Sequence, residues 1–132
     1  MAKIILAEDH VMVRQGLKRI IEEDPHLKVI HEADDAVELL KLLEDSAPDM
    51  VILDISMPRL EGLEAAKIIR QQYPEIKILI LTMHREKHYF SKAQEIGVHG
   101  YILKEDADTD LNLAIKTILQ GNTYTSPLVG EA

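Results

Sequence analysis

Short apolar runs alternate with amphipathic segments along almost the whole chain. Runs rich in isoleucine, leucine and valine have the length and composition of strands in a parallel sheet. We predict strands at residues 3–7, 27–33, 50–53, 76–81 and 100–103. The run at 27–33 mixes charged with apolar residues, which is typical of a strand at the edge of a sheet.

A segment with apolar residues every three or four positions follows each run, and this spacing predicts helices. We expect helices at 11–23, from Asp34 or Asp35 (as the capping residue) to Pro48, at 60–73, at 85–96, and from Asp106 to Gly121. The apolar stripe of 85–96 is thin, and Gly97 is well suited to cap its carboxyl end. The fold class is therefore α/β, a doubly wound five-stranded parallel sheet in the order 2-1-3-4-5 with helices on both faces.

Composition limits the kinds of protein this can be. The 132 residues are 46% hydrophobic and 29% charged, which predicts one globular domain at 1–121 followed by a polar tail at 122–132, interpreted as the start of a linker. No cysteine is present, so disulfides and thiolate sites are excluded. The net charge of −8 argues against nucleic-acid binding by this piece. Because no run is long enough to span a membrane and the amino terminus does not resemble a signal peptide, we expect a cytoplasmic protein.

Polar side chains follow four of the predicted strands. Glu8 and Asp9 follow the first strand, Asp54 the third, Thr82 the fourth and Lys104 the fifth. Carboxyl ends of parallel strands share one edge of a sheet, and ligands bind there at the point where the strand order reverses. We therefore expect these five side chains to form one site between the first and third strands.

Three carboxylates in one place repel one another unless positive charge offsets them. Lys104 supplies one charge, and Mg²⁺ held by Glu8, Asp9, Asp54 and the backbone carbonyl of Ser56 would supply the rest. Such a site suits phosphoryl transfer to Asp54 as the nucleophile. Lys104 and the Thr82 hydroxyl would then contact the phosphoryl oxygens.

The motifs that carry these residues resemble those of response-regulator receiver domains in two-component systems, which have a flavodoxin-like or CheY-like fold. They are Glu8-Asp9, LDISMP around Asp54, LTMH around Thr82 and YILK around Lys104. The resemblance covers about residues 3–121. The segments EDHVMVRQGL and LAIKTILQGNTYTSP also resemble the NarL/FixJ subfamily, in which a linker leads to a LuxR-type helix-turn-helix domain.

This resemblance implies that a sensor histidine kinase phosphorylates Asp54 in a Mg²⁺-dependent reaction. The domain would catalyse no more than its own phosphorylation and dephosphorylation, and it would control transcription through a DNA-binding output domain that this sequence does not contain. Thr82 and Tyr101 would act as the switch, with Tyr101 turning inward. The signalling face would comprise the helix at 85–96, the strand at 100–103 and the last helix. A phosphorylation-dependent homodimer is a further implication.

Two positions depart from the commoner family pattern. Glu105 follows Lys104 where many receivers have a proline after a cis bond, so we expect a trans peptide here. Met83 follows Thr82 where a small residue is commoner, and its side chain would narrow access to the phosphoryl group.

Other interpretations remain open at this point. Glu8 and Asp9 could cap the following helix. His84 and His88 have the spacing of zinc ligands, but the segment HREKH lacks the glutamate of a zinc peptidase. An aspartyl-phosphate phosphatase would need an acid where Ser56 stands, and a flavin-binding module would need a phosphate loop where the Glu8-Asp9 pair stands. A stand-alone receiver that acts through protein contacts is the remaining alternative.

Overall fold

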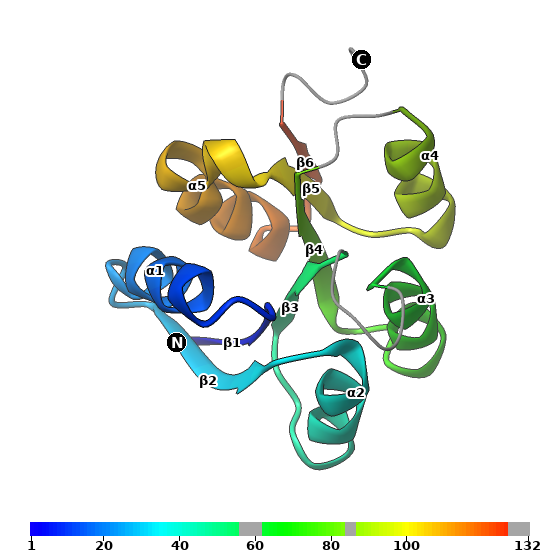
Figure 1. Cartoon of the computed structure of the whole chain (residues 1–132), viewed down its shortest axis with the longest axis horizontal. Coiled ribbons are helices and arrows are strands. Elements are labelled where there is room, and N and C mark those ends of the chain that lie inside the picture. Colours follow the sequence, from blue (N-terminus) through cyan, green and yellow to red (C-terminus); the bar gives the residue numbers. More distant parts are fainter. Residues whose placement is uncertain (56–61, 84–86, 127–132) are drawn as a thin grey trace.

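The computed structural model describes residues 1–55, 62–83 and 87–126. A six-stranded parallel sheet has the order β2-β1-β3-β4-β5-β6. Helices α1 and α5 cover one face, and α2, α3 and α4 cover the other (Figure 1). The strands are β1 (Ala2–Ala7), β2 (Leu27–Ala33), β3 (Met50–Asp54), β4 (Lys77–Thr82), β5 (Gly100–Leu103) and β6 (Tyr124–Thr125).

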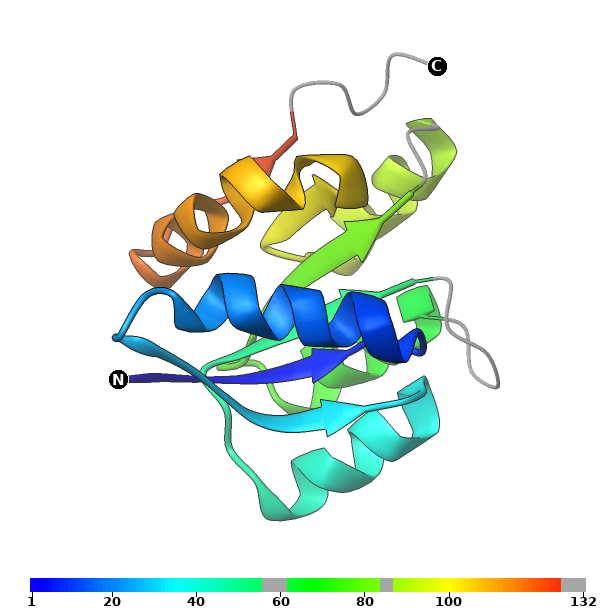
Figure 2. The ribbon, with the colours of Figure 1, turned by 60° about the vertical axis from the view of Figure 1, so that its left-hand side comes forward.

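The helices follow the strands in regular alternation, as the turned view in Figure 2 also shows. They are α1 (Val11–Glu22), α2 (Ala36–Asp45), α3 (Gly62–Gln72), α4 (Lys87–Ile96) and α5 (Ala107–Leu119), with a 3₁₀ turn η1 (Lys104–Asp106) before α5. The predicted doubly wound fold and its strand order are therefore confirmed. No helix within the described residues is long and apolar enough to cross a bilayer.

Two hydrophobic layers form because successive residues of a strand point to opposite faces of the sheet. In β3, Val51 and Leu53 pack toward α2 and α3, whereas Met50 and Ile52 pack toward α1 and α5. All four side chains are completely buried. A strand buried on both faces reads as a continuous apolar run, which is why the central strands could be predicted from the sequence.

The helix ends differ in how well the sequence predicted them. Asp35 is the amino-terminal cap of α2, and its carboxylate accepts a hydrogen bond of 2.8 Å from the Glu38 backbone N–H. Gly97 follows α4 with a φ of 94°, a left-handed conformation that favours glycine. Asp106 occupies the cap position of α5, but its side chain makes no capping hydrogen bond. The prediction for Asp106 was thus correct in position and wrong in mechanism.

The tail contains a short strand that its polar sequence did not predict. Residues Tyr124–Thr125 pair in parallel with Gly100 and Tyr101 of β5. Ser126 then donates its backbone N–H to the Tyr101 carbonyl at 3.0 Å, and its hydroxyl accepts the Leu103 N–H at 3.0 Å. The first residues of the tail therefore cover the edge of β5.

Candidate functional site

The sheet register brings the predicted site residues to one edge. Ala7 of β1 is level with Leu53 of β3, so the next residues, Glu8 and Asp54, lie side by side. Thr82 is paired with Leu103 at the end of β4 and β5. Lys104 follows Leu103 immediately. The five side chains thus come from the carboxyl ends of four strands, as the motif positions predicted.

Lys104 joins the two innermost carboxylates. Its Nζ lies 2.7 Å from Glu8 Oε1 and 3.1 Å from Asp54 Oδ2. Both acid side chains are only 1% exposed, and the lysine side chain is 19% exposed. These ion pairs are therefore mostly shielded from solvent. Charge interactions are stronger in the protein interior than at its surface.

Burial and neighbouring charges shift the pKa values of Glu8 and Lys104. Burial raises the pKa of Glu8, and the nearby Asp54 carboxylate adds to the rise, although Lys104 partly opposes it. Burial alone would lower the pKa of Lys104, but its bonds with Glu8 and the charge of Asp54 raise it overall. The lysine therefore stays charged, whereas the raised pKa makes Glu8 easier to protonate than an ordinary glutamate.

Asp9 and His10 extend the cluster toward solvent. One ligand atom each from Glu8, Asp9 and His10 lies within 4.8 Å of the others. His10 Nδ1 is 3.3 Å from both Glu8 Oε2 and Asp9 Oδ1. Among the described residues, the buried Asp9 Oδ1 accepts no hydrogen bond within the usual limits. Two carboxylates with an incompletely satisfied oxygen fit a divalent cation, and Lys104 joins Asp54 to one of them, Glu8.

The Glu8-Asp9 pair does not cap α1 in the usual way. His10 is the cap residue, and no side chain there makes a capping bond. Instead, Glu8 Oε2 accepts the His10 backbone N–H at 3.1 Å. The alternative interpretation of a capping pair is therefore wrong in detail, since the Glu8 carboxylate is turned toward its own loop and toward Lys104.

Thr82 and Tyr101 are as deeply buried as Glu8 and Asp54. Thr82 is completely buried and Tyr101 is 1% exposed. The Tyr101 ring makes an edge contact with Phe90 of α4, with ring centroids 5.3 Å apart and an interplanar angle of 77°. The tyrosine is thus already inside the fold in this structure. Its position links β5 directly to α4.

The backbone near Asp54 is closely packed, and part of it lies outside the described residues. A Cβ on Gly62 would collide with the backbone of Ile55 and approach the Asp54 carbonyl, so only glycine lets α3 begin this close to the end of β3. The predicted carbonyl ligand of Ser56 and the histidine His84 lie outside the described residues. The described residues contain no cis peptide bond, as expected for the Lys104–Glu105 bond.

Sequence reasoning missed one group that lies behind the acid loop. Arg14 of α1 donates from Nη1 to the Glu8 carbonyl at 2.8 Å and from Nε to Glu32 Oε1 at 3.2 Å. Glu32 lies 18 positions from Arg14 in the sequence, so spacing alone did not indicate this contact. The position of Arg14 shortly after the Glu8-Asp9 pair was the one feature of the sequence that could have indicated a contact with the acid loop.

Comparison with known proteins agrees with this geometry. The model of the response regulator receiver domain matches residues 4–116, so the chain belongs to the response regulator receiver family. Relatives and structural neighbours of the LuxR type agree with the NarL/FixJ resemblance.

One curated relative is the transcriptional regulatory protein DegU of Brevibacillus brevis, 36% identical over 96% of this chain and 54% of the relative. The chain thus spans about half of that protein's length. A LuxR-family response regulator from Aurantimonas sp. SI85-9A1 has 40% identity and a TM-score of 0.93, covering 98% of this chain and 92% of that one. The receiver domain of RcsB from Salmonella enterica serovar Typhimurium, solved with the phosphomimetic BeF3⁻, has 28% identity and a TM-score of 0.91, covering 97% and 95%.

Proposed function

We propose that this receiver domain accepts a phosphoryl group on Asp54 from a phosphohistidine of a sensor kinase. The observation that carries the proposal is the pairing of Lys104 Nζ with Asp54 Oδ2 at 3.1 Å and with Glu8 Oε1 at 2.7 Å. A buried carboxylate that is paired with a lysine at the carboxyl edge of the sheet is placed to act as a nucleophile. The receiver family and the position of Asp54 at the sheet edge support the same role.

The transfer requires in-line attack and neutralisation of charge. An Asp54 oxygen forms the new bond to phosphorus, the bond from phosphorus to the donor nitrogen breaks, and the leaving imidazole takes up a proton. Lys104 would stabilise the phosphoryl oxygens, which requires it to loosen its ion pair with Asp54. The Thr82 hydroxyl is proposed as a second contact to these oxygens.

Glu8, Asp9 and Asp54 would hold Mg²⁺, with Ser56 as the predicted carbonyl ligand. When bound, the cation would neutralise charge on the transferred group. Asp9 would bind it directly through the oxygen that lacks a hydrogen bond, and the buried Glu8 would orient the site. Burial is the main cause of the raised pKa of Glu8, and the Asp54 carboxylate adds to it; a bound cation would favour the ionised form of Glu8.

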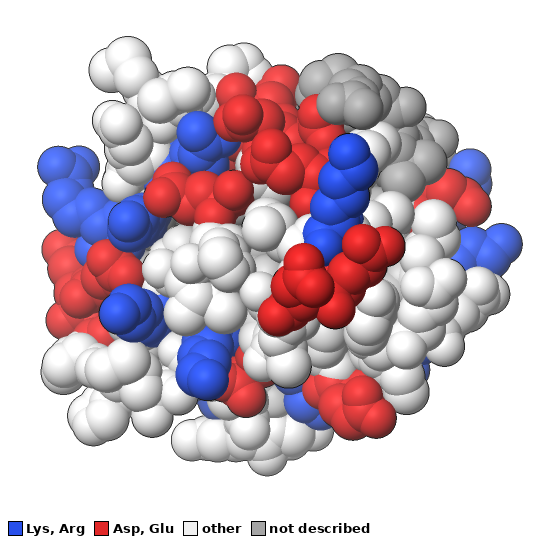
Figure 3. Space-filling view, turned by 90° about the horizontal axis from the view of Figure 1, so that it is seen from below, with Lys and Arg blue, Asp and Glu red and all other residues white. Residues whose placement is uncertain are grey.

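Thr82 and Tyr101 are proposed as the switch, and α4, β5 and α5 as the signalling face. The full-length protein would carry a DNA-binding output domain after residues 122–132 and would regulate transcription, with phosphorylation favouring a homodimer. Support comes from the relative DegU, a transcriptional regulatory protein of about twice this length. Binding of nucleic acid by the receiver itself is not proposed, because on the face in Figure 3 lysines and arginines are interspersed with acids. A cytoplasmic location remains a prediction.

Mass spectrometry after incubation with phosphoramidate and Mg²⁺ tests this proposal. Wild type should gain one phosphoryl group, and Asp54→Asn should gain none. Asp45→Asn is the matched control, because Asp45 is an exposed residue at the end of α2. Phosphorylation that persists in Asp54→Asn, or a wild type that gains nothing, would contradict the assignment.

A further inference from the structure

Arg14 binds three acceptors, one in the loop after β1, one near the end of β2 and one just after β2. Its side chain is 14% exposed. Besides the Glu8 carbonyl and Glu32, it contacts the Asp34 carboxylate through Nη1. A guanidinium offers donors in a rigid, planar arrangement, so it can hold several acceptors in one fixed geometry. Arg14 therefore joins the loop after β1 to the end of β2.

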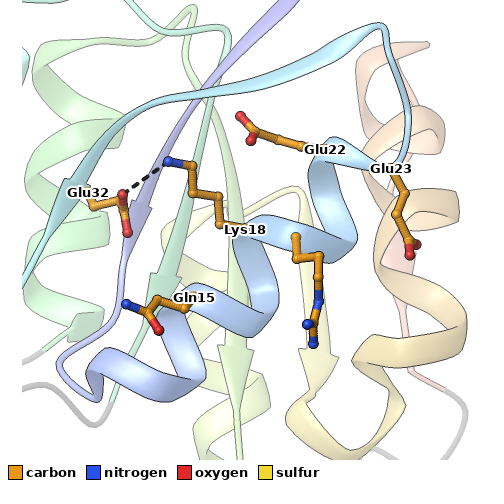
Figure 4. A pocket seen from close by; sticks show the side chains of 6 residues that line it. Gln15, Lys18, Glu22, Glu23 and Glu32 are labelled. Carbon is orange, nitrogen blue, oxygen red and sulfur yellow. Dashed lines mark ion pairs between the residues drawn. The ribbon is translucent and has the colours of Figure 1, made fainter.

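Other contacts support the same connection. Lys18, one turn further along α1, points toward Glu32, and its Nζ lies 3.5 Å from Glu32 Oε2 (Figure 4). The Glu8 backbone N–H donates to the Ala33 carbonyl at 3.1 Å. Both backbone groups of Glu8 are thus hydrogen-bonded: its N–H donates to β2, and its carbonyl accepts from Arg14.

The Glu8 carbonyl belongs to the peptide unit between Glu8 and Asp9. Rotation of this peptide would change the direction of the Asp9 side chain relative to the buried Glu8 carboxylate. We propose that Arg14 is a positioning residue for the cation site: it fixes this peptide so that the Glu8 and Asp9 carboxylates face the same point. This inference rests on the proposed function, and Arg14 itself touches neither the cation nor the reacting atoms.

Positioning and simple electrostatics predict opposite effects when Arg14 is replaced. Removal of a positive charge near the acids makes the site more negative, so Coulomb's law alone predicts tighter binding of Mg²⁺. Loss of positioning predicts weaker binding, and removal of groups that orient metal ligands costs roughly 10- to 100-fold in affinity. The direction of the change therefore separates the two explanations.

Calorimetric titration of the 132-residue chain with Mg²⁺ at fixed ionic strength tests the proposal. Arg14→Gln should raise the Kd about 10-fold. Arg14→Lys should recover part of the affinity, because an ammonium group can bond the carbonyl but not all three acceptors at once. Arg19→Gln is the matched control: it removes the same charge from an exposed position of the same helix and should not raise the Kd.

Glu32→Gln keeps Arg14 and removes one of its charged acceptors, so a smaller rise in the Kd is expected. Circular dichroism without Mg²⁺ establishes that each variant is folded, and Arg14→Lys, which keeps the charge, carries the test if Arg14→Gln does not fold. An unchanged or lower Kd in folded Arg14→Gln, or an equal loss in Arg19→Gln, overturns the inference while the wild-type titration still supports the site. A wild type that does not bind Mg²⁺ overturns the cation site and this inference together.

Discussion

Helices α4 and α5 lie on opposite faces of the sheet near β5 and differ sharply in how firmly they are held. In α5, five residues are buried: Ala107, Leu111, Ala114, Ile115 and Ile118. In α4, Ala93 is the one buried residue, with Phe90 and Ile96 partly buried. Helix α5 packs against α1, β4, β5 and β6, whereas the main packing partner of α4 is α3. A helix with few buried apolar contacts opens at low free-energy cost.

This difference divides the predicted signalling face into two parts. The Tyr101 ring projects to the α4 side and contacts Phe90. Its neighbour Ile102 packs into the layer that contains α5. A change at the proposed phosphoacceptor site should therefore reach the loosely held α4 through Tyr101, while α5 provides a firm support for β5.

Truncation of buried leucine on α5 should have the largest effect. Leu111 is completely buried, so Leu111→Ala should lower the free energy of unfolding by about 3 kcal/mol. Leu113→Ala on the same helix should change it by less than about 0.5 kcal/mol, because Leu113 is 56% exposed. Urea unfolding of both variants measures this.

The same measurement on α4 completes the comparison. Phe90 is only partly buried, so Phe90→Ala should cost about 1.5 kcal/mol, roughly half the cost at Leu111. An equal or larger cost at Phe90 would show that α4 is as firmly anchored as α5. The proposed division of the face would then be wrong.

The next largest effect concerns the tail that supports β5. Ser126→Ala removes the acceptor of the buried Leu103 N–H and should cost about 1 kcal/mol in unfolding free energy. Thr125→Ala is the control, since Thr125 is exposed. If both changes are equally mild, the contact of the tail with β5 does not stabilise this side of the sheet.

A smaller effect is expected from pH at the loop between α4 and β5. Burial and the charges of Lys77 and Arg70 lower the pKa of His99, whose Nδ1 accepts the Ile78 N–H at 3.0 Å. A histidine whose pKa is lower in the folded state stabilises the protein above its unfolded pKa of about 6.5, and this stability is lost as the pH falls through the folded pKa.

Wild type should therefore lose a few tenths of a kcal/mol more than His99→Asn between pH 7.5 and 5.5, because the half-buried ring is partly screened by solvent. Asparagine retains an acceptor near the position of Nδ1 and does not titrate. His31→Asn, on the exposed part of β2, should behave like wild type. Equal pH dependence in wild type and His99→Asn would contradict this role of His99.

Features that leave a repeating pattern in the sequence could be predicted, whereas single contacts between distant residues could not. Central strands such as β3 were predictable because burial on both faces requires a continuous apolar run. Glu8, Asp54 and Lys104 could be brought together because parallel strands end at one edge. The contact of Ser126 with Leu103 and those of Arg14 with Glu32 and Asp34 join distant positions through single hydrogen bonds or ion pairs, which leave no periodic pattern.

Amide hydrogen exchange with and without Mg²⁺ and BeF3⁻ tests most directly whether chemistry at Asp54 reaches α4. Wild type should change its exchange in α4 and at the end of β4, whereas the buried part of α5 at 111–118 should not change. Asp54→Asn should show no response. Unchanged exchange from Thr82 to Leu103 in wild type, or a response of equal size in α5, would contradict the account.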